Sequence, residues 1–110
     1  MNGETPPRVP YPRLVPASDM THVVLAFDDN RLVGDLFGQF DQNLALIEQR
    51  LKVDVVARGN QVTIKGPHTA CEQARAVLEQ LYHRLQQGSE VLPGDVDGAI
   101  RMASSDGGQM

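Results

Sequence analysis

The chain has 110 residues, enough for one domain with a modest core. Trp is absent and only 5% of the residues are aromatic, so the core must rest on aliphatic side chains. The formal net charge is −4, and most of it falls in residues 89–110, while residues 21–88 are nearly neutral. A nearly neutral block does not favour non-specific binding of nucleic acid, because such binding depends on the neutralisation of phosphates.

The sequence also bears on the compartment. No apolar run approaches the length that spans a bilayer, and the first 19 residues lack the apolar segment of a secretory signal. The single cysteine, Cys71, cannot form an internal disulfide, which fits a reducing environment. We therefore expect a cytoplasmic protein that has no membrane partner.

The first elements follow from composition and alternation. Residues 1–20 contain five prolines and show no hydrophobic periodicity, which predicts a flexible Pro-rich arm. The alternating apolar residues of the segment 22–27 predict a strand. Asp28-Asp29-Asn30 offers a cap for a short helix over residues 31–37, and Gly38 is placed to end it.

A second helix and a hairpin are expected next. Asp41 is the expected N-cap of a helix from Gln42 to about Leu51, with Phe40 as a hydrophobic staple before it. Residues 52–58 and 61–65 predict two strands, joined by a tight turn at Gly59-Asn60. Alternation places Val53, Val55 and Ala57 on one face of the first strand, and Val62 and Ile64 on one face of the second.

The longest helix has the clearest pattern. Thr69 and Glu72 match a capping box, and Gly88 is placed to end the helix. One continuous apolar stripe follows helical spacing: Ala70, Ala74, Val77, Leu78, Leu81 and Leu85. Beyond it, Pro93-Gly94-Asp95 predicts a turn before a short amphipathic helix over residues 96–102, and residues 103–110 are expected to be flexible.

The sequence offers no convergent set of catalytic or metal-binding residues. It lacks a phosphate-binding loop of the Gly-x-x-x-x-Gly-Lys-Ser/Thr type. The pair His68 and Cys71 supplies too few ligands for a zinc site, and Asp28-Asp29 is explained by a solvated helix cap. We expect no catalytic site, no metal and no cofactor in this chain.

Four cations remain as candidates for binding RNA. Arg50, Lys52, Arg58 and Lys65 fall near the end of the second helix and in the hairpin, and Arg58 and Lys65 are expected close to its turn. From charge alone, an ordinary solvated face is the better explanation. No pair of aromatic residues interleaves with these charges, so a base-stacking platform is not supported.

The expected order of elements, βααββα over residues 22–87, resembles a minimal type I KH domain. The KH loop Gly-x-x-Gly is represented by Gly38-Gln-Phe-Asp41, and Leu44 and Ile47 match the apolar positions of the helix after it. The resemblance implies an α+β fold in which a three-stranded sheet packs on helices. The departure at Asp41 matters, because a carboxylate there repels phosphate and a Cβ crowds the approach of a nucleic-acid backbone.

Longer stretches resemble the N-terminal region of bacterial PhoH-like, phosphate-starvation-inducible ATPases. The most specific stretches are residues 38–51 and the segment Pro93-Gly-Asp-Val-Asp-Gly-Ala-Ile-Arg-Met102. The resemblance implies that a P-loop ATPase domain, absent from this sequence, binds ATP and Mg²⁺ and builds a hexameric ring. It also implies a role in RNA metabolism and partnership with a YbeY-type endoribonuclease. On this basis we divide the chain into an arm (1–20), a KH-like domain (21–88) and an acidic linker with a short helix that leads to the ATPase domain (89–110).

Two hypotheses for function stay open. In the first, a non-catalytic accessory module binds RNA through Gly38, Gln39, Asn43, Arg50, Lys52, Arg58 and Lys65. In the second, the module binds protein, either its own subunits or the endoribonuclease, with no direct RNA clamp. An independent enzyme is the least supported reading. The first two differ in whether the four cations share a face with the Gly38–Asp41 loop.

Overall fold

The computed structural model describes residues 20–108, so the predicted arm lies outside the described residues except for Met20. The elements are β1 (Met20–Ala26), α1 (Asn30–Phe37), a short 3-10 turn (Gln39–Asp41), α2 (Gln42–Leu51), β2 (Asp54–Arg58), β3 (Gln61–Pro67), α3 (His68–Gln86) and α4 (Pro93–Gly108). The predicted α+β class and the KH-like βααββα order are confirmed. The additional helix, α4, follows that unit.

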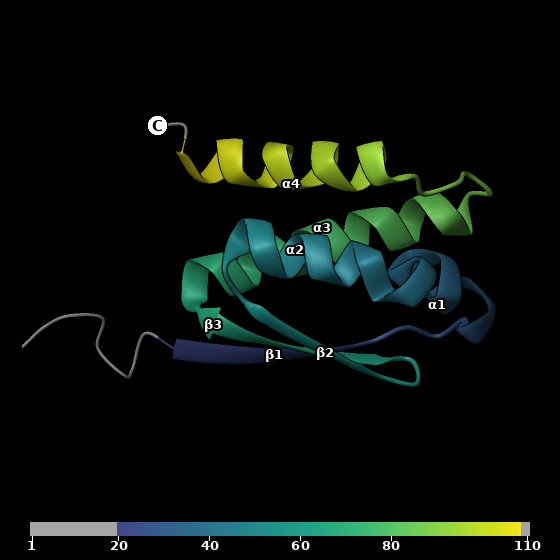
Figure 1. The fold of residues 1–110 in the computed structure, drawn as a ribbon, viewed down its shortest axis with the longest axis horizontal. Coiled ribbons are helices and arrows are strands. Elements are labelled where there is room, and N and C mark those ends of the chain that lie inside the picture. Colours follow the sequence, from purple (N-terminus) through teal and green to yellow (C-terminus); the bar gives the residue numbers. More distant parts are fainter. Residues whose placement is uncertain (1–19, 109–110) are drawn as a thin grey trace, which may run out of the picture.

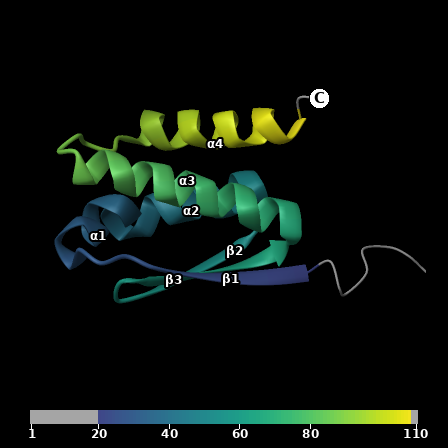
Figure 2. The ribbon, with the colours of Figure 1, turned by 180° about the vertical axis from the view of Figure 1, so that it is seen from behind.

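The three strands form one antiparallel sheet in the order β1-β3-β2. The helices lie on one side of the sheet, and α4 is the outermost layer in both views (Figures 1 and 2). No helix of the described residues covers the other face of the sheet. The α1 helix and the loop between α3 and α4 lie at one end of the molecule, and β1 begins at the opposite end.

Alternation in the strands explains which face packs on the helices. Val55, Val62 and Ile64 are buried, whereas Asp54, Val56 and Lys65 are exposed. Because successive side chains of a strand point to opposite faces, the predicted apolar face is confirmed. Gly59 has the positive φ of +58° that the predicted hairpin turn requires.

The core lies between this face and the helices. The predicted stripe of α3 is buried along its length, apart from the half-buried Ala70. The apolar residues predicted for α2 are buried as well: Leu44, Ile47 and Leu51. A fully buried Leu costs several kcal/mol when truncated, so this stripe carries much of the stability.

The last helix is longer than expected. It begins at Pro93 and reaches Gly108, so the prediction of flexible residues is wrong for 103–108. Val96, Ala99 and Ile100 are buried, and α4 contacts both α3 and α2. The sequence pattern understated this helix because Ala, Gly and Ser give its outer turns no apolar stripe. The domain boundary at residue 88 stays a prediction.

Three predicted capping details are wrong. Asp41 stands at the N-cap position of α2, but its side chain makes no capping hydrogen bond. Phe40 is exposed and makes no hydrophobic staple. The long helix begins at His68 with Pro67 as its cap, and Glu72 pairs with Arg75 instead of closing a box. By contrast, the predicted caps of α1 are confirmed, with Asp29 accepting from the Arg31 amide and Gly38 at the C-terminal cap.

Among residues 20–108, no helix combines the length and the apolarity needed to cross a lipid bilayer.

Candidate interaction site around the Gly38–Asp41 loop

The Gly38–Asp41 loop joins α1 to α2 and has an unusual backbone. Phe40 and Asp41 both have φ of +56°, and Gly38 has φ of +82°. For residues with a Cβ, the left-handed region costs roughly 1–2 kcal/mol each. Such strain persists only where the surroundings fix it, and it is common at functional sites.

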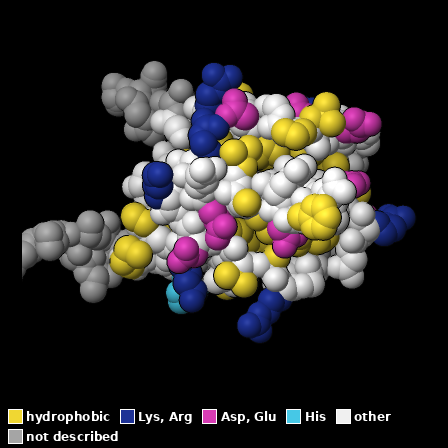
Figure 3. Space-filling view, in the orientation of Figure 1, with side chains coloured by type: hydrophobic (Ala, Val, Ile, Leu, Met, Phe, Trp, Pro, Cys, Tyr) yellow, Lys and Arg dark blue, Asp and Glu magenta, His cyan; other side chains and the backbone are white. Residues whose placement is uncertain are grey.

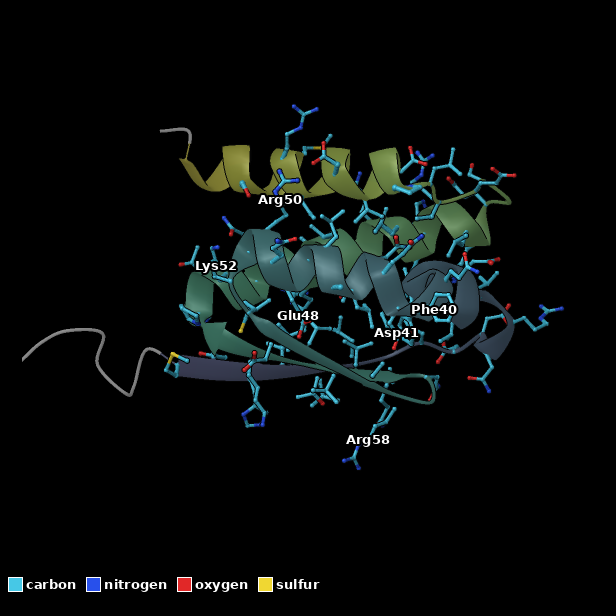
Figure 4. All side chains as sticks on the ribbon, viewed as in Figure 1. Phe40, Asp41, Glu48, Arg50, Lys52 and Arg58 are labelled. Carbon is cyan, nitrogen blue, oxygen red and sulfur yellow. The ribbon has the colours of Figure 1, made fainter. Side chains whose placement is uncertain are left out.

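This backbone places an aromatic side chain in solvent. Phe40 is 93% exposed, the highest value among the large apolar side chains that the structure describes as exposed. Figure 4 shows Phe40 and Asp41 together at the end of the molecule where α1 lies. Single exposed apolar residues are common on protein surfaces, but Phe40 stands on a backbone held in the left-handed region, so its ring is presented to solvent in a fixed place.

Buried contacts hold the loop in place. The side-chain amide of Asn43, which is only 3% exposed, donates to the Leu36 carbonyl at 3.0 Å. The Gly38 amide donates to the Gly34 carbonyl at 2.9 Å. A Cβ at Gly38 would lie 2.8 Å from Nδ2 of Asn43, so glycine is required there by space as well as by φ. Asn43 therefore has a structural role.

A cavity of about 590 Å³ opens beside the loop. It lies between α1, the start of α2 and the segment that connects α3 to α4. Its walls include apolar side chains, amides and two carboxylates: Leu32, Leu92, Gln39, Gln42, Asp35 and Glu90. Among residues 20–108, no Lys or Arg lines it. The cavity therefore suits an apolar or cationic group better than a phosphate.

A carboxylate also occupies the edge of β2. The Oε2 atom of Glu48 accepts a hydrogen bond of 2.8 Å from the Val55 amide. Figure 4 shows Glu48 between α2 and β2, further along α2 than Asp41. This backbone donor is therefore already satisfied by a side chain of α2.

The four candidate cations do not converge on the loop. Arg50 pairs with Asp97 of α4, and Arg58 lies at the hairpin end of β2 (Figure 4). Lys52 and Lys65 both line a second cavity of about 520 Å³, together with Glu48 and Asp54. Equal numbers of positive and negative groups make that cavity neutral overall.

Register places Lys65 further from the turn than expected. It lies opposite Asp54 and His22, whereas Arg58 lies opposite Gln61 beside the turn. The expectation that both cations lie close to the turn is therefore wrong for Lys65. In the space-filling view, Lys and Arg side chains stand apart and acidic groups lie between them (Figure 3).

The ion pair between Arg50 and Asp97 changes the pKa of the Asp97 carboxyl. Its hydrogen bond lowers the pKa of the Asp97 carboxyl below the usual value, and the charges of Arg50 and Arg101 act in the same direction. Arg101 lies 3.3 Å from the same carboxylate. Arg50 is thus engaged in holding α4 against α2.

The seven candidate residues consequently separate into four places. Gly38, Gln39 and Asn43 line the first cavity, and Lys52 and Lys65 line the second. The remaining two, Arg50 and Arg58, lie elsewhere. Sequence reasoning missed Phe40 and Glu48 as site residues. Phe40 could have been identified from its position in the Gly38–Asp41 segment, which matches the Gly-x-x-Gly loop of KH domains.

The described part of the chain offers little for covalent or metal chemistry. No group of three or more His, Cys, Asp or Glu residues gathers there in a way that could hold a metal ion. Cys71 is buried, and desolvation, followed by the charge of Glu72, raises the pKa of its thiol. A thiol with a raised pKa is a poor nucleophile.

Comparisons with known proteins agree with the fold and the sequence resemblance. No family model matches the sequence. A PhoH-like protein of Bacillus subtilis is 32% identical over 68 residues, which is 62% of this chain and 21% of that protein. A PhoH-like protein of Mycobacterium tuberculosis is 31% identical over 78 residues, which is 71% of this chain and 22% of that protein.

A solved structure shares the fold. The crystal structure of a protein of unknown function from Aeropyrum pernix superposes with a TM-score of 0.64 and 16% identity, covering 83% of this chain and 50% of that one. This chain spans only about a fifth of the length of the PhoH-like proteins that it matches. The similarity to PhoH-like proteins thus extends over about one fifth of their length.

Proposed function

We propose that this chain is a non-catalytic KH-like module that binds a protein partner through the Gly38–Asp41 loop. The observation that carries the proposal is Phe40, 93% exposed on a backbone that is held in the left-handed region. Aromatic side chains dominate the binding energy of many protein interfaces when they enter a pocket of the partner. The fixed loop also reduces the entropy that is lost when Phe40 binds.

Charge separates this proposal from an RNA clamp. In KH domains the Gly-x-x-Gly loop clamps the nucleic-acid backbone. Here the loop ends in the carboxylate of Asp41, and the residues that the structure describes around the adjacent cavity include acidic but no basic side chains. Two of the four candidate cations share a cavity with two carboxylates, and a third is paired with Asp97. RNA binding is therefore the competing function.

The similarity to PhoH-like proteins suggests which partner the loop binds. A YbeY-type endoribonuclease is the first candidate, and contacts with further copies of the same module are the second. Under this proposal, ATP and Mg²⁺ chemistry belongs to a P-loop domain outside this sequence, and the module works in the cytoplasm. The module then connects RNA cleavage and ATP hydrolysis by holding proteins together.

The test is a titration of this chain with the endoribonuclease, with calorimetry as the readout. Phe40→Ala should weaken binding about tenfold or more, since truncation of a central aromatic anchor commonly costs this much. Val56→Ala is the matched control, because Val56 is an exposed apolar residue (49%) on the open face of the sheet. Equal loss in both variants, or no binding of the wild-type chain, would overturn the proposal.

A parallel titration addresses RNA. The wild-type chain is titrated with single-stranded RNA at low salt, where phosphate contacts are strongest. We expect no saturable binding. Saturable binding that is lost on replacement of Lys52 and Lys65 by Ala would favour the RNA-binding function instead.

A further inference from the structure

The two edges of the sheet are protected to different extents. At one edge, β2 begins with Asp54 and ends with Arg58, and Glu48 already accepts the hydrogen bond of its Val55 amide. At the other edge, the seven residues of β1 (Met20–Ala26) include no Lys, Arg, Asp, Glu or Pro. Soluble proteins commonly place such residues on edge strands, because they hinder pairing with another chain. The sequence of β1 offers no such hindrance.

Hydrogen bonding fixes which backbone groups of β1 point outward. The Phe27 amide donates to the Asn60 carbonyl at 3.0 Å, so Phe27 and every second residue before it bond to β3. The amides and carbonyls of the residues between them point away from β3: Met20, His22, Val24 and Ala26. Within residues 20–108, no strand pairs with this outer edge of β1.

The side chains of β1 that face the helices are also incompletely covered. Val23 and Leu25 are half-buried, whereas their partners on β3, Ile64 and Val62, have no exposed surface. A further strand beside β1 would cover this remaining apolar surface and satisfy the outward backbone groups at the same time. Backbone hydrogen bonds of this kind are how extended segments add to an exposed sheet edge.

We propose that two copies of this chain associate by antiparallel pairing of their β1 strands across a two-fold axis. A second copy suits this edge because β1 has no acidic or basic residue of the Asp, Glu, Lys or Arg type, so self-pairing brings no such like charges together. The axis uses the β1 edge of both copies, and Glu48 occupies the Val55 amide at the β2 edge. The assembly therefore closes at two copies.

The outward backbone groups select one register. With the two-fold axis at Val23, His22 of each copy lies opposite Val24 of the other, and Met20 lies opposite Ala26. All four outward residues of each strand then take part in hydrogen bonds, whereas a shift of the register leaves some of them unpaired. The half-buried Val23 side chains of the two copies meet on the helix side of the sheet. A strand pair of this length is smaller than a standard interface, so we expect a weak dimer.

The test is sedimentation equilibrium of the full chain over a wide range of concentrations. The mean mass should rise from 12.0 kDa toward twice that value and should go no further. Phe40→Ala should dimerise like the wild-type chain, because the interface uses no residue of the Gly38–Asp41 loop. A failure of this inference is therefore distinct from a failure of the proposed function.

Paired substitutions on β1 test the register. His22→Lys with Val24→Lys places like charges opposite each other at two positions, and should weaken dimerisation about tenfold. His22→Glu with Val24→Lys places opposite charges there, and should restore the dissociation constant to within about threefold of the wild-type value. Both side chains are exposed, so the fold should tolerate either change. Val56→Lys, on the exposed face of β2, is the matched control and should leave dimerisation unchanged.

Hydrogen exchange gives a second readout at the same edge. The amides of His22 and Val24 should exchange more slowly as the protein concentration rises, because they become hydrogen-bonded in the dimer. The Val55 amide, which is already bonded to Glu48, should not respond to concentration. A chain that stays monomeric, assemblies larger than a dimer, a charge-swapped variant as weak as the double Lys variant, or an equal loss in Val56→Lys would each overturn the proposal.

Discussion

The side-chain amide of Asn43 donates a hydrogen bond of 3.0 Å to the backbone carbonyl of Leu36, which ties the first turn of α2 to the last turn of α1. This bond is buried and spans the Gly38–Asp41 loop. Because the loop is also strained at two residues, the bond supplies part of the free energy that fixes Phe40 in solvent.

Replacement of Asn43 by Leu should therefore destabilise the chain although the two side chains have the same branching and number of heavy atoms. The Leu36 carbonyl would lose its partner in a buried position, which costs about 1–3 kcal/mol. The free energy of unfolding from urea titration measures the change. Gln49→Ala, an exposed change in the same helix, is the control and should alter stability by less than about 0.5 kcal/mol. Equal effects would show that the bond contributes nothing specific.

Two glycines of the same region should respond in opposite directions to alanine. Gly38→Ala places a Cβ 2.8 Å from Asn43 Nδ2 at a φ of +82°, so it should destabilise by more than about 1 kcal/mol. Gly34 lies inside α1, where an added Cβ meets nothing within 4 Å. Gly34→Ala should stabilise by about 0.5–1 kcal/mol. Thermal unfolding of the two variants checks both signs, and a stabilised Gly38→Ala would refute the described loop geometry.

Asp41 allows charge and backbone strain to be separated. Asp41→Gly removes the left-handed penalty, so it should stabilise the chain by about 1 kcal/mol. It also restores the Gly-x-x-Gly pattern of KH loops, and we expect RNA affinity at low salt to appear or increase. Asp41→Asn removes only the charge. RNA binding gained in the Gly variant but not in the Asn variant would indicate that the Cβ, not the carboxylate, blocks the approach of RNA.

The bond between Glu48 and β2 has a testable consequence at the sheet edge. Glu48→Ala should leave the Val55 amide without its 2.8 Å partner, and the exchange of that amide with solvent deuterium should accelerate. Glu48→Gln retains a side-chain oxygen that accepts the bond, so it should keep most of the protection. A Gln variant that exchanges as fast as the Ala variant would argue that the charge of Glu48 matters more than its geometry.

The sequence predicted the fold better than the site. Alternating valines and the stripe from Ala70 to Leu85 defined strands and a helix, because burial imposes its period on the sequence over many residues. The conformation of the Gly38–Asp41 loop depends on single residues, which show no such repeating pattern. Phe40 was expected to pack before α2, but the left-handed backbone at Phe40 and Asp41 turns the ring into solvent. The sequence pattern does not signal this strain, because it is held by a buried hydrogen bond from Asn43 to the Leu36 carbonyl across the loop.

The surface positions of the cations could not be predicted from their spacing in the sequence. Arg50 and Lys52 are two residues apart, yet Arg50 pairs with Asp97 on α4 while Lys52 adopts a left-handed cap with φ of +61° and lines the second cavity. The partner of Arg50 lies 47 residues away in the sequence. Clustering along the chain therefore did not indicate clustering on the surface.

The pairing of Arg50 with Asp97 predicts how the attachment of α4 depends on pH. Because the hydrogen bond from Arg50 lowers the pKa of the folded-state Asp97 carboxyl, the pair contributes stability above the unfolded pKa of about 3.8. That contribution should be lost as the pH falls from about 5 through the lowered pKa. Arg50→Gln should reduce the free energy of unfolding at pH 7 and should make it depend less on pH in the acid range, as measured by urea midpoints between about pH 3 and pH 7.

The control is Arg58→Gln, which removes an exposed cation on β2 and should leave the acid dependence unchanged. If Arg50→Gln keeps the full acid dependence, other carboxylates such as Asp29 and Glu72, whose pKa values are also lowered by their arginine partners, would account for it instead.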